Sequence, residues 1–230
     1  VFNDKVFWLS YANTLFLTFY GTIWSMVVTI FGAYALSKKR LVGRKMFNFL
    51  IVFTMWFSAG MIPTYLNYLA TRSAFEGIGI ADDKWVVVIA MGVAAFNIIL
   101  LRNSFESVPK EIEEAAIVDG ATEFQILKSV YLPMSKASLA TVGLFYGLSR
   151  WNGYFWARQI IRSQLEWPLQ VYIKVTLEQV LGYEMIPDLT YLPDSLVYAM
   201  ILCAIIPIII IYPYIQKYFA KGVNLGGVKE

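Results

Sequence analysis

The residue types that perform chemistry are scarce in this sequence, and their scarcity excludes most kinds of catalytic site. The 230-residue chain has no histidine, and its one cysteine, Cys203, has no second cysteine with which to form a disulfide. The chain therefore cannot build zinc sites of the usual His and Cys type, Ser-His-Asp or Cys-His catalysis, or histidine proton relays. It also lacks a G-x-x-x-x-G-K-[ST] sequence for binding ATP in a P-loop. We expect no catalytic residue, no metal site and no cofactor in this chain.

A polar and aromatic cluster is the first candidate binding site. It consists of Arg150, Trp151, Asn152, Tyr154 and Phe155, near the end of an apolar stretch in which Arg150 is the only charged residue. Aromatic faces stack on sugar rings, and Asn and Arg bind hydroxyls or carboxylates, so the cluster suits the lining of a carbohydrate path. An interfacial aromatic belt with a snorkelling arginine explains the same residues equally well.

The second candidate is the polar segment 102–136, which is too long for a simple connection. Ser107 is a candidate N-cap, Pro109 suits a first helical turn, and Glu111, Glu113 and Glu114 complement the positive end of a helix. This helix should end at Gly120 in a left-handed conformation. Thr122 and Gln125 form an approximate capping box for a second short helix, which should end at Leu132-Pro133. The small side chains of Ala115 and Ala116 would let another protein approach closely, although an ordinary surface helix is the simpler interpretation.

The elements that position these clusters are predicted to be membrane-spanning helices. The composition is 58% hydrophobic and 15% charged, with mean hydropathy +0.58, against roughly 25% charged residues in a soluble domain. Five apolar stretches approach the length of about 20 residues that a bilayer requires. They are 15–36 with a lead-in from Val6, 46–66, 85–101, 138–157 and 196–216. The predicted fold class is an all-α, polytopic transmembrane bundle.

The distribution of charge predicts an orientation for this bundle. Loops 37–45 and 102–136 and the C-terminal tail carry 12 Lys and Arg residues, against 6 on the other side. The positive-inside rule places the first side, with the C-terminus, in the cytoplasm. The net charge of +3 is too small to suggest binding to nucleic acid, and no stretch has a central Asp or Glu of the kind that ion-driven transporters use. Because the N-terminus falls outside, we expect a sixth, N-terminal spanning helix to be missing.

Segment 102–136 also matches a known pattern. Glu114-Ala115-Ala116-x3-Gly120, followed after nine residues by Val130-x-Leu132-Pro133, resembles the EAA motif E-A-A-x3-G-x9-I-x-L-P of ABC importer permease subunits. Val130 replaces the isoleucine, and Asp119 fits the usual form. Further similarity is to the carbohydrate-uptake, maltose-type branch, and it is carried by Asn13-Thr14, 33–36 with Gly43-Arg44, Pro63, Trp151-Asn152 and the closing segment 217–229.

This resemblance implies a type I importer permease, with residues 1–230 as a single transmembrane domain in a bacterial cytoplasmic membrane. Loop 103–133 would hold the coupling helix that contacts an ATPase subunit. Segment 158–196, with its amphipathic core near 169–181, would be an extracytoplasmic loop that docks a sugar-binding protein, although a structural lid over the bundle explains it equally well. Glu114 would be the anchor, Ala115 and Ala116 the close-packing face, and Asp119-Gly120 the turn, with Leu132-Pro133 completing the contact. The implied partners are a second, non-identical permease subunit, two ATP-binding subunits that hold Mg-ATP, and the binding protein. The substrate would be an oligosaccharide, and Arg150, Arg158 and Arg162 would suit an acidic one unless they pair with loop carboxylates.

Other classes fit the sequence less well. A membrane enzyme would need a cluster of His, Asp or Glu, and a channel would need a pore helix or selectivity loop. Neither is present, and the EAA segment would have no role in either. An ABC permease for a peptide, phosphate or an amino acid remains the alternative within transporters.

Overall fold

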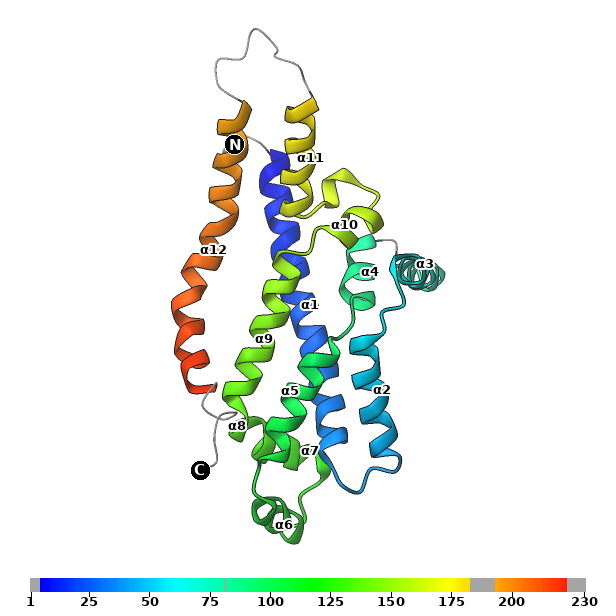
Figure 1. Ribbon diagram of the computed structural model, residues 1–230, viewed down its shortest axis with the longest axis vertical. Coiled ribbons are helices and arrows are strands. Elements are labelled where there is room, and N and C mark those ends of the chain that lie inside the picture. Colours follow the sequence, from blue (N-terminus) through cyan, green and yellow to red (C-terminus); the bar gives the residue numbers. More distant parts are fainter. Residues whose placement is uncertain (1–4, 81, 183–192, 223–230) are drawn as a thin grey trace. The chain divides into compact units, whose positions relative to one another are not determined.

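The protein is described here by a computed structural model covering residues 5–80, 82–182 and 193–222, which form helices and connecting turns without any strand (Figure 1). The helices are α1 (Lys5–Ser37), α2 (Arg44–Trp56), α3 (Met61–Gly77), α4 (Asp83–Ala90), α5 (Ala95–Glu106), α6 (Lys110–Val118), α7 (Glu123–Ile126), α8 (Leu132–Met134), α9 (Lys136–Trp151), α10 (Phe155–Ile160), α11 (Leu169–Gly182) and α12 (Pro193–Gly222). A π-helical turn, η1 (Leu127–Tyr131), joins α7 to α8, and a 3-10 turn, η2 (Gln164–Glu166), precedes α11. The prediction of an all-α fold is confirmed.

The chain packs as two compact units, each assembled from three separate segments. The first unit contains residues 1–22, 61–91 and 147–213, and the second contains 23–60, 92–146 and 214–230. Each unit has its own buried core. Because α1 and α9 contribute residues to both units, neither unit is a continuous stretch of sequence.

Among the described helices, α1 is the one that is long and apolar enough by itself to cross a membrane. The count rises to three if each of two interrupted pairs, α2 with α3 and α4 with α5, forms one span. In α12 the described apolar part, Tyr198–Ile210, is shorter than a full span. Helix α1 agrees with the predicted stretch 15–36 and its lead-in from Val6.

Three predicted stretches are interrupted rather than continuous. Stretch 46–66 is broken at residues 57–60, where Gly60 has a left-handed φ of 87°, and Pro63 lies in the first turn of α3 instead of near the end of a span. Proline has no N–H to lose in a first turn, which explains why a new helix starts there. Stretch 85–101 is broken around Gly92, also left-handed at 50°, and stretch 138–157 is broken at residues 152–154. The apolar pattern predicted which stretches are apolar, but it did not predict these backbone turns within them.

The core of the first unit packs α3, α4, α10 and α11 against the first half of α1. Its buried members include Leu17, Tyr68, Val86, Ile160 and Val171. Asn13 and Thr14 add polar contacts at one edge: Asn13 Nδ2 donates to the Leu165 carbonyl at 2.8 Å, and the Leu169 N–H donates to Thr14 Oγ1 at 2.7 Å. Two adjacent polar residues of α1 therefore hold η2 and the start of α11. Loop residues 183–192 of the predicted segment 158–196, and the tail residues 223–230 of the closing segment, lie outside the described residues.

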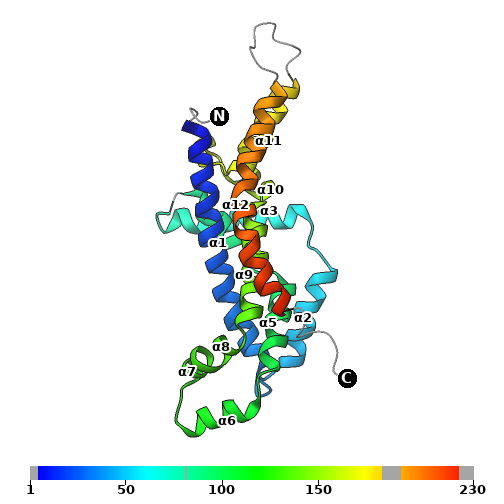
Figure 2. The same cartoon turned by 90° about the vertical axis from the view of Figure 1, so that its left-hand side faces the viewer.

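The core of the second unit packs α5, α7, η1 and α9 against the last turns of α1. Its buried residues include Ala33, Leu101, Phe105, Leu127 and Val142. Figure 2 shows α6, α7 and α8 in succession beside the ends of α1 and α5. The polar segment 102–136 is therefore packed on the hydrophobic core of the second unit.

Candidate functional site

Helix α6 carries the first half of the predicted coupling motif. It begins after Pro109, whose backbone is extended, and Glu111 and Glu113 occupy its first turn. Ser107 does not cap α6 as predicted; it ends α5, where its hydroxyl donates to the Ser104 carbonyl at 2.7 Å. The residue before a proline is disfavoured in the helical region, so the sequence Val108-Pro109 separates the two helices and leaves Ser107 on the α5 side.

The turn after α6 is fixed by backbone hydrogen bonds. Gly120 has φ 77°, which confirms its predicted left-handed conformation. The Gly120 N–H donates to the Ile117 carbonyl and the Ala121 N–H donates to the Ala116 carbonyl, both at 3.0 Å. This is the Schellman pattern of a helix C-terminus. Thr122 and Gln125 then form the predicted capping box at the start of α7, so both ends of the short turn are determined.

The second short helix does not end at Leu132-Pro133 as predicted. It continues through the π-helical turn η1, in which the Leu132 N–H donates to the Leu127 carbonyl, and Pro133 lies in the first residues of α8. A proline inside an α-helix removes one hydrogen bond and collides with the preceding turn, and here that preceding turn is the wider, π-helical one. Helix α8 ends two residues after Pro133, at a turn on Ser135, and α9 begins at the next residue.

A buried ion pair ties α6 to the end of α1. Lys38 Nζ lies 2.5 Å from Glu113 Oε1 and donates to the Tyr131 hydroxyl at 2.9 Å, while that hydroxyl donates to Glu113 Oε2 at 2.5 Å. The Lys38 ammonium also lies over the rings of Tyr34 and Tyr131, 4.4 and 4.0 Å from their centroids. The side chains of Lys38 and Glu113 are 9% and 18% exposed. The sequence did not predict this contact, because Glu113 was assigned only the role of complementing the positive end of the helix.

The electrostatics of this group follow from its burial and its hydrogen bonds. Burial lowers the pKa of Lys38 and raises the pKa of Tyr131. For Glu113, partial burial favours the protonated form, but the hydrogen bonds from Lys38 and Tyr131 outweigh it and lower the pKa. At neutral pH the carboxylate is therefore ionised and joins three helical elements.

The rest of the predicted coupling motif lies on or near the surface. Glu114, Ala115, Asp119 and Gly120 are exposed, whereas Ala116 is half-buried against the core of the second unit. Leu132 is half-buried and Pro133 exposed. Five large apolar side chains of the loop are also exposed, and Val118 is 86% exposed; they are Ile112, Ile117, Val118, Phe124 and Met134. The loop thus presents an acidic and apolar surface at one end of the second unit.

The second candidate cluster belongs to the first unit, and the structure divides it. Arg150 and Trp151 are both 6% exposed. The Arg150 side chain packs so closely on Gly21 that a Cβ there would lie 3.0 Å from its Cδ, and Arg150 Nη1 donates to the Val87 carbonyl at 3.3 Å. Trp151 packs edge-on against Tyr11, and its indole N–H has no hydrogen-bond acceptor among the described residues.

The other three residues of the cluster lie on the surface. Asn152 is exposed and its Nδ2 donates back to the Leu148 carbonyl at 3.0 Å. Tyr154 and Phe155, at the break between α9 and α10, are 41% and 39% exposed. The five residues therefore provide two buried groups and three surface groups rather than one continuous lining.

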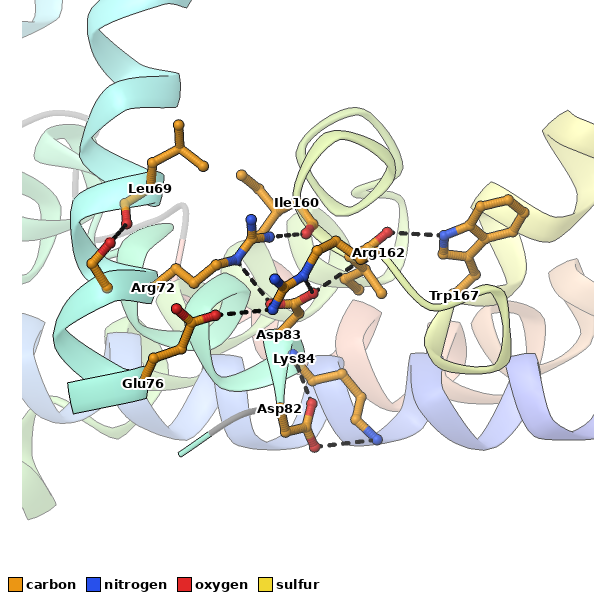
Figure 3. A network of polar contacts seen from close by, with 11 residues as sticks. Leu69, Arg72, Glu76, Asp82, Asp83, Lys84, Ile160, Arg162 and Trp167 are labelled. Carbon is orange, nitrogen blue, oxygen red and sulfur yellow. Dashed lines mark hydrogen bonds and ion pairs between the residues drawn. The ribbon is translucent and has the colours of Figure 1, made fainter. Parts of the chain in front are cut away.

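An ion network in the first unit accounts for Arg162, which the sequence offered as a binder of acidic sugar. Arg162 pairs with Asp83 Oδ2 at 3.1 Å and with Glu76 Oε1 at 3.0 Å, and Arg72 pairs with the same Asp83 at 2.9 Å (Figure 3). The Asp83 side chain is only 5% exposed. Arg162 thus pairs with carboxylates of its own chain, as the sequence had left open.

The neighbouring cation, Arg158, is arranged differently. It is exposed, it lies 4.6 Å over the Trp167 ring, and it forms no ion pair among the described residues.

Within the part of the chain that the structure describes, no group of three or more Cys, Asp or Glu side chains could hold a metal ion.

Comparison with known proteins identifies the family. Residues 6–225 match the family described as "Binding-protein-dependent transport system inner membrane component". The chain is 35% identical to the "Polygalacturonan/rhamnogalacturonan transport system permease protein YtcP" of Bacillus subtilis (strain 168), over 100% of this chain and 79% of that protein. It is also 35% identical to "Protein LplC" of the same organism, over 100% of this chain and 77% of that protein.

A solved structure is similar over nearly the whole chain. It is titled "Crystal structure of a bacterial ABC transporter involved in the import of the acidic polysaccharide alginate" and aligns with a TM-score of 0.83 and 45% identity, covering 95% of this chain and 77% of that one. The family match covers more than half of the chain and the relatives exceed 30% identity. The chain therefore belongs to the inner membrane components of binding-protein-dependent transport systems.

Proposed function

We propose that this chain is the permease subunit of an ABC importer for an acidic oligosaccharide, and that α6 is the helix through which ATP hydrolysis in another subunit drives transport. The observation that carries the proposal is the construction of the loop. A short helix with a fixed C-terminal turn exposes Glu114 and Ala115, while Glu113 of the same helix is bound to Lys38 at the end of α1. A surface for a partner is thus joined to a candidate spanning helix.

The mechanism follows from these contacts. An ATP-hydrolysing subunit would receive Glu114, Ala115 and Asp119 and move α6 when its nucleotide state changes. The Lys38–Glu113 pair and the Tyr131 hydroxyl would pass that displacement to α1 and η1, because buried ionic and aromatic contacts resist separation. This chain would supply the docking surface and the path, and the partner would hold Mg-ATP.

The assembly would contain a second, non-identical permease subunit, two ATP-binding subunits and an extracytoplasmic sugar-binding protein. The loop 102–136 and the C-terminus would face the cytoplasm, because 12 basic residues lie on that side and 6 on the other. The segment 158–196 would then face the binding protein.

The substrate class is supported by the names of the relatives and by side chains of the first unit. A polygalacturonan transporter subunit and an alginate importer are both named for acidic polysaccharides. Arg158 offers an exposed guanidinium beside Trp167, and Trp151 offers a buried indole N–H without an acceptor among the described residues. The exposed guanidinium of Arg158 suits the carboxylate of a uronate.

The test is transport by the complete complex in proteoliposomes, with binding protein loaded with oligogalacturonate, alginate oligosaccharides or a neutral maltodextrin. We expect ATP-dependent uptake, and stimulation of ATP hydrolysis, with the acidic sugars. Preference for maltodextrin would contradict the acidic class, and uptake without ATP would contradict the importer itself. Trp151→Phe keeps an aromatic ring and removes the N–H, so uptake should fall about tenfold if that group binds sugar. Trp156→Phe, which changes a ring stacked on Tyr68, is the matched control.

A further inference from the structure

A cavity of about 590 Å³ lies in the second unit, where the loop after α1 meets the start of α6. Its lining includes five basic side chains, Lys38, Lys39, Arg40, Arg44 and Lys110, and three acidic ones, Glu106, Glu113 and Glu114. The cavity is therefore positively charged overall. The docking surface proposed above shares Glu114 with this cavity but leaves its basic charge without a role.

Three of the five basic groups are neutralised by carboxylates of the chain itself. Lys38 pairs with Glu113, Arg40 with Glu123 and Arg44 with Glu106. Arg44 is further held by the Leu36 carbonyl, to which its Nε donates at 2.7 Å. These pairs fix the shape of the cavity wall and account for two of its three acidic groups.

The remaining two cations, Lys39 and Lys110, are brought together by the fold. They come from the loop after α1 and from the first residue of α6, both are exposed, and neither forms an ion pair among the described residues. The adjacent Lys110 ammonium lowers the pKa of Lys39. Two like charges at short range repel, and an anion placed between them would turn that repulsion into two charge-assisted hydrogen bonds.

An apolar surface begins where this basic cavity ends. Helix α2 starts at Arg44, and its next residues expose large apolar side chains, Met46, Phe47, Phe49, Leu50 and Phe53. Phe49 is 65% exposed. A charged cavity followed directly by an exposed apolar helix face matches the two parts of a phospholipid, and basic clusters at the ends of spanning helices recognise anionic lipids.

We propose that this cavity binds the phosphate of an anionic phospholipid headgroup between Lys39 and Lys110, with the acyl chains lying along α2. The bound lipid holds the loop after α1 against the start of α6. Membrane composition would thereby influence the position of α6 without contact to the transported solute. Glu114 faces the same cavity, so a partner that contacts Glu114 would be sensitive to whether the lipid is bound.

The test counts lipids on the complete transporter complex by native mass spectrometry in detergent, titrated with dioleoylphosphatidylglycerol or dioleoylphosphatidylcholine. The double variant Lys39→Gln/Lys110→Gln should weaken phosphatidylglycerol binding roughly thirtyfold, from about one kcal/mol per lysine at a membrane surface. The matched control is Lys128→Gln/Lys136→Gln, which removes the same charge from exposed positions outside the cavity. This control should retain wild-type binding, and phosphatidylcholine binding should not change in either variant.

Two results would overturn the proposal. Equal loss of phosphatidylglycerol in both double variants, or no loss in either, would show that these lysines form no specific site. Displacement of the lipid signal by millimolar inorganic phosphate, with the same dependence on Lys39 and Lys110, would show that the site takes a free phosphate and not a headgroup.

Discussion

The Lys38 ammonium lies 2.5 Å from a carboxylate oxygen of Glu113 and over the rings of Tyr34 and Tyr131. One residue follows the last turn of α1 and the other belongs to α6, 75 positions later. We propose that this pair passes a force applied to α6 on to a candidate membrane helix.

Breaking that pair should loosen α6 without unfolding the protein. Glu113→Gln leaves Lys38 without a charged partner in a largely buried place and should cost about 2 kcal/mol, the range for hydrogen bonds to charged groups. Hydrogen exchange of residues 110–118 in the assembled complex should accelerate accordingly. Glu111→Gln, exposed in the first turn of the same helix, is the control and should accelerate exchange far less, because it loses only an interaction with the helix dipole. Wild-type protection in Glu113→Gln would contradict the proposed attachment.

The same carboxylate predicts a dependence on acid. Its pKa is lowered in the folded protein, so protonation favours the state in which α6 is detached. The stabilisation is complete above the ordinary pKa of 4.5 and is lost as the pH falls through the lowered value. A nitroxide label at Val118→Cys, in a Cys203→Ser background, should become more mobile below about pH 4.5. In Glu113→Gln this change should disappear; an identical acid transition there would assign it to another group.

The left-handed turn at Gly120 gives a prediction free of steric complication. No atom lies within 4 Å of a Cβ built at this position, so Gly120→Ala pays only for its φ of 77°, at about 1 kcal/mol. We expect fraying at the end of α6 and weaker coupling of ATP hydrolysis to uptake. Gly120→Asn should recover part of the loss, because asparagine tolerates this conformation better. Gly32→Ala, which is also free of contacts but lies within α1, should not impair coupling.

Asp83 should be the most sensitive residue of the ion network in the first unit. Its carboxylate is 5% exposed and holds both Arg72 and Arg162. Asp83→Asn leaves these guanidinium groups without their buried partner and should destabilise the complex by about 3 kcal/mol. Glu76→Gln removes an exposed pair with Arg162 and should cost less than about 1 kcal/mol. Thermal unfolding of the two variants should therefore separate clearly, and equal melting temperatures would contradict this ranking.

The sequence predicted those features that depend on local chemistry. Gly120, Thr122 and Gln125 behave as predicted because helix caps are decided by a few adjacent residues. The all-helical fold followed from the apolar composition. The family resemblance followed from the motif between Glu114 and Pro133, because a long motif with fixed spacing seldom matches by chance.

Features that depend on distant partners could not be predicted in this way. Nothing near Glu113 in the sequence indicates that Lys38 binds it, and Asp83 gives no sign of Arg162, 79 positions away. The breaks in the apolar stretches were missed because Gly60 and Gly92 sit among apolar residues, where periodicity is insensitive to a single turn. Ser107 was assigned to the wrong helix because a capping side chain suits either end of a short connection.

If the exposed face of α6 docks on an ATP-hydrolysing subunit, a photoreactive group on that face should cross-link to it. Ala115→Cys in a Cys203→Ser background would carry a benzophenone, with Ser73→Cys on α3 as the control on the opposite predicted side of the membrane. Irradiation of the assembled complex should join position 115 to the ATP-hydrolysing subunit, with a yield that changes when ATP is added, and position 73 should give no such product. Absence of that product at position 115, or equal yields from both positions, would contradict the claim.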